Sequence, residues 1–160
     1  MATSVEEFVS GEDMPTFHSV GDILDFAIAR EAQSHEFYVS LAARVAGPHV
    51  RQVIRNFAID ELQHKLRLEA IKAGKASFLD EEIGDLGITE TVAEVAPGPE
   101  MSYPDLLVFA MKREKAAFRL YTNLASIAGK TECRDTLLKL AQEEAQHKLR
   151  LEIEYDWETA

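Results

Sequence analysis

Two short segments of the sequence carry residues whose types and spacing could support chemistry. Residues 60–69 read DELQHKLRLE, and residues 143–152, which lie 83 positions later, read EEAQHKLRLE. Each segment contains a glutamate followed three residues later by a histidine. The pairs are Glu61 with His64 and Glu144 with His147. Because residues three apart share one face of a helix, the carboxylate and imidazole of each pair could hold one metal ion between them.

The repeat extends well beyond these two segments. From Ser19 onward, identical residues recur at the same offset of 83 without a gap. They include Asp22 and Asp105, Leu24 and Leu107, Phe26 and Phe109, Arg30 and Arg113, Tyr38 and Tyr121, and Arg51 and Arg134. The chain is therefore an internally duplicated pair of helices. Each half also carries one lone glutamate, Glu31 or Glu114, which lies 30 residues before the glutamate of the Glu–His pair.

Helical spacing of apolar residues predicts four helices, each bounded by capping and stop residues. The predicted helices cover about 19–46, 48–73, 103–128 and 131–157. Within each half the turn is so short that the two helices must be antiparallel neighbours, which places the lone glutamate level with the Glu–His pair. A long crossover over 75–102 joins the halves. An N-terminal arm over 1–18 precedes a single domain over 19–157.

Composition limits the classes of function. The chain has 160 residues, of which 46% are hydrophobic, and this suits one domain with its own core. The formal net charge of −11 makes nucleic acid and anionic membranes unsuitable partners. Cys133 is the only cysteine, so an intrachain disulfide and a CxxC iron site are both excluded. No apolar run has the length of a signal peptide or membrane span, and a cytoplasmic location is expected by default.

Four inward glutamates and two histidines on four helices form the donor set described for di-iron and di-manganese bundle proteins. On these residues, from about Ser19 to Tyr155, the chain resembles the rubrerythrin and ferritin-like family. The resemblance implies an all-α, ferritin-like four-helix bundle, built from two duplicated helix hairpins joined by a long crossover. It implies the metal ligands Glu31, Glu61, His64, Glu114, Glu144 and His147, with Glu61 and Glu144 bridging the ions.

The implied cofactor is a pair of metal ions per chain. Four carboxylates in an apolar interior would repel one another and take up protons unless cations joined them. Oxygen and imidazole donors favour iron, with manganese or zinc as alternatives. The six-ligand set is closer to that of bacterioferritin, because Ala117 and Ser34 stand where a rubrerythrin has a further glutamate and its counterpart. The cysteines of a rubredoxin module are also missing from this sequence.

Five further residues are predicted to surround the ligands. Asp60 and Glu143 precede the bridging glutamates and, by resemblance, would accept a hydrogen bond from the opposite histidine; the alternative is a solvated acid. Tyr38 and Tyr121 lie two turns beyond the lone glutamates, where the hydroxyl could reach a carboxylate or the ring could simply fill the core. His35 is either a hydrogen-bonded core histidine or an extra ligand or proton donor.

The family resemblance implies an oxidoreductase that reacts with O₂ or H₂O₂, as a ferroxidase or peroxide reductase, and draws on an electron donor that the sequence does not identify. The alternative is a protein that binds, stores or delivers metal without catalysis. A purely structural bundle would require both Glu–His pairs to be coincidental. The resemblance also implies a homodimer, with Tyr155 and Trp157 as candidate interface residues.

Overall fold

The computed structural model describes residues 19–74 and 100–160, and these residues form two compact units. The predicted N-terminal arm over 1–18 and residues 75–99 of the predicted crossover lie outside the described residues. Every regular element within the described residues is a helix. This confirms the all-α fold class.

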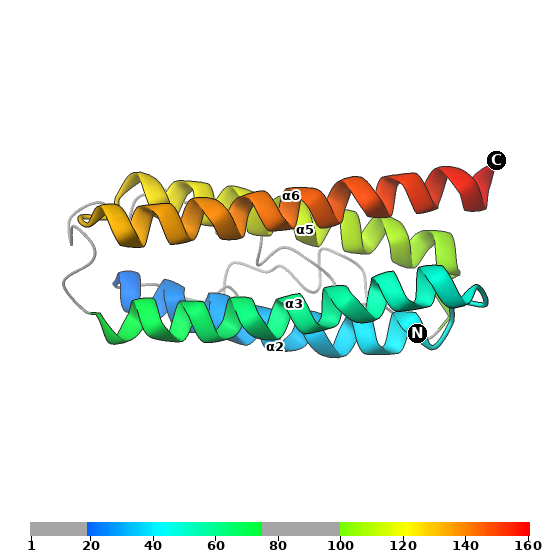
Figure 1. Ribbon diagram of the computed structural model, residues 1–160, viewed down its shortest axis with the longest axis horizontal. Coiled ribbons are helices and arrows are strands. Elements are labelled where there is room, and N and C mark those ends of the chain that lie inside the picture. The colour runs from blue at the N-terminus through cyan, green and yellow to red at the C-terminus, as the bar shows by residue number, and fades with distance from the viewer. Residues whose placement is uncertain (1–18, 75–99) are drawn as a thin grey trace. The chain divides into compact units, whose positions relative to one another are not determined.

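The first unit is a hairpin of α2 (Val20–Ala42) and α3 (Pro48–Ala73), and the second is a hairpin of α5 (Tyr103–Ser126) and α6 (Thr131–Thr159) (Figure 1). In each hairpin the two helices run antiparallel and are joined by a short turn. We call them the first and the second hairpin. They correspond to the two halves of the sequence repeat.

Serine caps start the first helix of each hairpin. The backbone N–H of Asp22 donates to Ser19 Oγ at 3.2 Å, and the N–H of Asp105 donates to Ser102 Oγ at the same distance. Each serine thus satisfies one of the amide groups that the first turn of a helix leaves without a carbonyl partner. The predicted capping serines therefore act at equivalent positions of the repeat.

The first helix of each hairpin ends earlier than predicted, at Ala42 instead of 46 and at Ser126 instead of 128. In both cases the chain tightens into turns whose amides bond to the carbonyl three residues back. The acceptors are the repeat-related carbonyls of Leu41 and Ala42 in one hairpin and of Leu124 and Ala125 in the other. In the first hairpin, Arg51 also donates to the carbonyl of Val45, from Nε at 3.2 Å and Nη2 at 3.0 Å. This side chain supplies a partner that a longer helix would have provided.

Leucine, isoleucine and aromatic side chains fill the interior along each hairpin. The largest fully buried ones in the first hairpin are Ile23, Tyr38, Leu41, Ile54 and Leu68. Those in the second are Leu107, Tyr121, Leu124, Leu137, Leu140 and Leu151. None of the described helices is long and apolar enough to span a membrane. The buried apolar stripes form the interior of each hairpin and hold the few charged residues that lie among them.

Candidate metal centre

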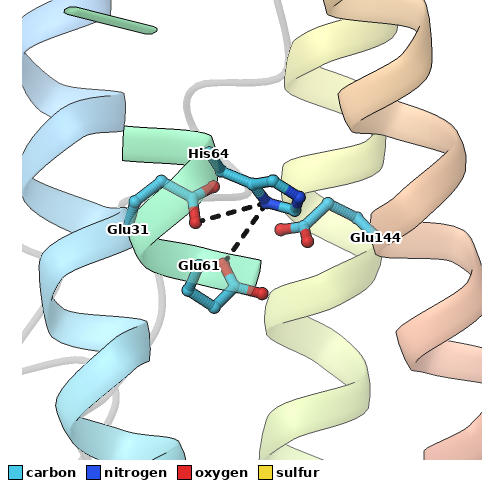
Figure 2. A group of neighbouring side chains, drawn as sticks. All are labelled: Glu31, Glu61, His64 and Glu144. Carbon is cyan, nitrogen blue, oxygen red and sulfur yellow. Dashed lines mark ion pairs between the residues drawn. The ribbon is translucent and has the colours of Figure 1, made fainter. Parts of the chain in front are cut away.

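The first hairpin brings together three of the predicted ligands. α2 carries Glu31 and α3 carries Glu61 and His64, and all three side chains are at most 3% exposed. His64 Nδ1 lies 3.7 Å from Glu31 Oε2 and 3.8 Å from Glu61 Oε2. Figure 2 shows the two carboxylates turned toward the imidazole. Each residue offers one donor atom, and these atoms lie within 4.8 Å of one another. We call these three residues the first half-site.

The second hairpin repeats this arrangement at the equivalent positions. Glu114 from α5 and Glu144 and His147 from α6 are at most 4% exposed. His147 Nδ1 lies 3.7 Å from Glu114 Oε1 and 3.5 Å from Glu144 Oε1. Their donor atoms also lie within 4.8 Å of one another. We call them the second half-site. The structure thus groups each histidine with the lone glutamate of its own hairpin, which spacing alone did not establish.

The helix geometry explains why the donors of each half-site meet. The histidine follows its glutamate by three residues, so both side chains project from one face of the second helix of the hairpin. The lone glutamate lies on the facing helix at nearly the same number of residues from the turn, and therefore at nearly the same height. Each half-site consequently requires only one hairpin and its short turn.

Burial makes the first half-site electrostatically costly without a cation. The pKa of Glu31 is raised well above its ordinary value of 4.5, first by burial and then by the adjacent Glu61 carboxylate, while His64 acts in the opposite direction. Both leading causes penalise the charged carboxylate, and a divalent cation would offset both of them. Two carboxylates and one imidazole are also donors that iron, manganese and zinc accept. The residues therefore fit a metal ion.

Two buried tyrosines lie on the lone-glutamate helices, two turns beyond the glutamates. Tyr38 is 1% exposed and Tyr121 is 2% exposed. The Tyr38 ring packs edge-on against Phe57, with ring centroids 5.5 Å apart. This contact shows that Tyr38 contributes to the core. The predicted approach of either hydroxyl to a ligand carboxylate stays a prediction.

The acids that precede the Glu–His glutamates are neither fully buried nor fully exposed. Asp60 and Glu143 both have intermediate exposure, on the flank of α3 and α6 respectively. This placement differs from that of the ligand glutamates beside them, which are buried. Acceptance of a hydrogen bond from the histidine of the other hairpin stays a prediction.

His35 lies one turn after Glu31 and links the two helices of the first hairpin. Its Nδ1 lies 2.8 Å from the carbonyl oxygen of Ala58, which fixes Nδ1 as the protonated, donating nitrogen. Ala58 precedes Glu61 by three residues, so the bond ties α2 to α3 close to the half-site. The contact supplies the hydrogen bond of one of the two expected roles for this part-buried side chain, and the role of extra ligand or proton donor stays a prediction.

Replacing His35 with phenylalanine, the residue at the equivalent position of the second hairpin, is expected to lower stability without changing metal content. Loss of this hydrogen bond should reduce the free energy of unfolding by about 1 kcal/mol. Urea denaturation of the metal-free protein and metal analysis of the loaded protein measure the two quantities. A variant that binds fewer metal ions while remaining folded would instead identify His35 as a ligand.

One buried carboxylate, Glu154, is 8% exposed and was not among the predicted site residues. Tyr103 at the start of α5 donates its hydroxyl to Glu154 Oε1 at 3.2 Å. Burial, followed by the charges of Glu154 and Glu158, raises the pKa of the Tyr103 hydroxyl, so it stays protonated at neutral pH and can donate. The signal was available, since Glu154 follows Leu151 by three residues and so lies on the inward face of α6.

Replacing Tyr103 with phenylalanine is expected to destabilise the protein by about 1 kcal/mol, because Glu154 would lose a hydrogen bond to a carboxylate in a mostly buried position. Urea denaturation measures the change. In a Glu154→Leu background, Tyr103→Phe should reduce the free energy of unfolding little further, because no carboxylate then requires a hydrogen-bond donor. Equal losses in both backgrounds would show that the tyrosine stabilises the protein by another contact.

Comparison with known proteins gave one family and one structure. The model of the family described as Rubrerythrin matches residues 22–155. A solved structure of a hypothetical protein from Pyrococcus furiosus is similar at 25% sequence identity and a TM-score of 0.67, over 86% of this chain and 89% of that one. No curated protein matched. The matched region includes all six predicted ligands and all of the four helices except the start of α2 and the end of α6. It confirms the ferritin-like four-helix-bundle class.

Proposed function

Because the chain belongs to the rubrerythrin family, we propose that its two half-sites join into one centre that binds two metal ions, with iron as the expected metal. The observation that carries the proposal is the exact repetition of a buried Glu, Glu and His cluster in both hairpins. Four carboxylates bring four negative charges, which two divalent ions would balance. A duplicated chain with one half-site per hairpin suits a centre with two similar ions.

In this proposal, Glu61 and Glu144 bridge the two ions. Glu31 with His64 completes the coordination of one ion, and Glu114 with His147 completes that of the other. The distances of 3.5–3.8 Å from each histidine to the carboxylates of its own hairpin support this grouping. The bridging role of Glu61 and Glu144 is taken from the family.

The activity we propose is that of an oxidoreductase acting on O₂ or H₂O₂. When bound, two iron ions supply two electrons together, which matches the reduction of one H₂O₂ and two protons to two water molecules. The protein contributes a buried site that excludes bulk water and fixes the six donors. An external electron donor must then return two electrons to the iron.

Ala117 and Ser34 bear on which activity to expect. A rubrerythrin has a further glutamate at the position of Ala117, and it supports peroxide reduction. Here neither Ala117 nor Ser34 offers a carboxylate to the ions. We therefore favour iron oxidation over rapid turnover of peroxide. The missing carboxylate at Ala117 is also the observation that keeps metal storage or delivery as the second candidate.

Rapid mixing distinguishes the two candidates. Protein loaded anaerobically with two Fe²⁺ per chain is mixed with O₂ or H₂O₂, and the near-ultraviolet absorbance of oxidised iron is followed. Oxidation many times faster than that of free Fe²⁺ in the same buffer supports the enzyme. Oxidation at the rate of free iron supports binding alone. The double variant Glu61→Ala/Glu144→Ala is the control for iron bound elsewhere on the protein.

The partners and location stay proposals of the same kind. We propose a homodimer in the cytoplasm, for which Trp157, 77% exposed near the end of α6, and the neighbouring Tyr155 are candidate contacts. Light scattering coupled to size-exclusion chromatography tests the dimer. A monomer at micromolar concentration would remove this part of the proposal and leave the metal centre unaffected.

A further inference from the structure

The second hairpin carries a surface groove that the metal centre does not use. The groove has a volume of about 400 Å³ and lies between α5 and α6. Its lining residues are Lys115, Phe118 and Arg119 from α5, and Ala145, Lys148, Leu149 and Glu152 from α6. Phe118 is 39% exposed and Leu149 is 58% exposed, so both offer apolar surface to a ligand. We call this feature the α5–α6 groove.

The charge of the groove is opposite to that of the protein. Lys115, Arg119 and Lys148 supply three positive charges and Glu152 one negative charge, which gives a net +2 in a chain of net −11. Lys148 Nζ pairs with Glu152 along α6. The excess of basic over acidic side chains in the lining comes from the two α5 residues, Lys115 and Arg119. A positive site on an acidic protein favours anions that the rest of the surface repels.

The sequence repeat provides a comparison within the same molecule. The residues of the first hairpin that correspond to the groove lining are Ala32, His35, Glu36, Leu62, Lys65, Leu66 and Glu69. On the second helix the positions are again apolar or ion-paired. Leu62 and Leu66 are 40% and 64% exposed, and Lys65 pairs with Glu69 as Lys148 pairs with Glu152. The first-helix positions differ, and the net charge there is −1, from Glu36, Lys65 and Glu69.

On the first helix the two hairpins differ at all three lining positions, and on the second helix Ala145 stands where the first hairpin has Leu62. Lys115 replaces alanine, Arg119 replaces glutamate, and Phe118 replaces a histidine that turns to the carbonyl of Ala58. The first hairpin forms the same helix pair without any of the three, so the fold does not require them. Two cations and a part-exposed aromatic ring at one groove thus distinguish the second hairpin from the equivalent face of the first.

We propose that the α5–α6 groove binds a small organic anion with an apolar body, such as a medium-chain or aromatic carboxylate. The volume falls at the small end of the range of about 300–1,000 Å³ for ligand sites, which suits such a compound better than a long-chain lipid. Phe118, Ala145 and Leu149 would contact the apolar body. Arg119, whose guanidinium suits paired hydrogen bonds to a carboxylate, and Lys115 would bind the anionic end.

Calorimetric titration of the metal-free, full-length protein with decanoate, below its micellar concentration, tests this proposal independently of the metal centre. The expected result is saturable binding of one decanoate per chain. In the Lys115→Ala/Arg119→Glu variant, which carries the residues of the first hairpin at these positions, the affinity should fall at least tenfold. Decyltrimethylammonium, with the same chain length and a positive charge, should give no saturable binding.

A matched control keeps the charge change but moves it away from the groove. Arg134→Glu/Lys139→Ala replaces two exposed α6 cations outside the lining and alters the net charge by the same three units. This variant should bind decanoate within twofold of the original protein. Circular dichroism confirms that both variants are folded.

Three results would overturn the proposal. They are equal loss of affinity in both double variants, unchanged affinity in the groove variant, and binding that weakens with rising protein concentration. The first result would show that decanoate binding depends only on the net charge of the protein. The second would show that decanoate binds at a different site. The third would assign the groove to contact between copies of the chain.

Discussion

Replacing Glu61 with alanine is expected to abolish the binding of two metal ions per chain. Glu61 is fully buried and lies 3.8 Å from His64 Nδ1 within the first half-site. If it bridges the ions, its removal takes one donor from each. The metal content after anaerobic Fe²⁺ loading and desalting should fall from two ions to at most one, and Glu144→Ala should have the same effect.

The control for this prediction is Glu69→Ala on the same helix. Glu69 is exposed and pairs with Lys65, outside the half-site, so its removal should leave two ions bound. Glu61→Gln tests the charge with little change in shape. If Glu61→Ala and Glu144→Ala both retained two ions per folded chain, the assignment of the bridging ligands would be wrong.

The second large effect concerns metal and pH together. The pKa of Glu31 is raised in the folded, metal-free protein by burial and by Glu61. A carboxyl group with a raised folded pKa binds more protons in the folded than in the unfolded state, between the two pKa values. Its contribution to stability is therefore fully present below the ordinary value of 4.5, which applies to the unfolded chain, and is lost as the pH rises through the folded pKa. The metal-free protein should become less stable over that window.

Glu31→Gln isolates this effect, because an amide has similar shape and does not titrate. Thermal denaturation of the metal-free protein across the window should show a decline with pH that is smaller in Glu31→Gln than in the original protein. Identical pH dependence of the two proteins would contradict the raised pKa as a source of instability. A steeper decline in Glu31→Gln would contradict the predicted direction of the effect of the Glu31 pKa on stability.

Bound metal should restore the stability that the metal-free protein loses as the pH rises to neutrality. A ligand present at one hundred times its dissociation constant stabilises the folded state by about 2.7 kcal/mol per site. For a domain of this size, that corresponds to a rise in Tm of roughly 5–10 °C per site. Binding should also release protons, since the ligands must be deprotonated. A Tm that does not depend on Fe²⁺ or Mn²⁺ would indicate that the buried carboxylates do not hold metal.

The sequence predicted the helices and the half-sites because both depend on local periodicity. The spacing of Glu61 to His64 fixes one helix face, and the short turn fixes the height of Glu31 on the partner helix. The sequence repeat supports each of these predictions a second time, because the second half has the same spacing. Capping by Ser19 and Ser102 was predictable for the same reason, since a cap involves residues only three apart.

The features that sequence reasoning missed depend on contacts between helices. His35 donates to the carbonyl of Ala58, which lies 23 positions away in the sequence. Tyr103 donates to Glu154, which lies 51 positions away. The early end of α2 accompanies a turn in which the Arg51 side chain of α3 donates to the carbonyl of Val45. The α5–α6 groove required knowledge of which side chains face outward at the same level of two helices.

The central claim is that Glu31, Glu61 and His64 share one centre with Glu114, Glu144 and His147. Anomalous scattering measured across the iron and manganese edges, on crystals of protein purified without added metal, tests it directly. We predict two anomalous peaks per chain, about 3.5–4 Å apart, each beside one histidine and one lone glutamate, with Glu61 and Glu144 between them. Two widely separated peaks, one in each hairpin with no shared carboxylate, would contradict the account.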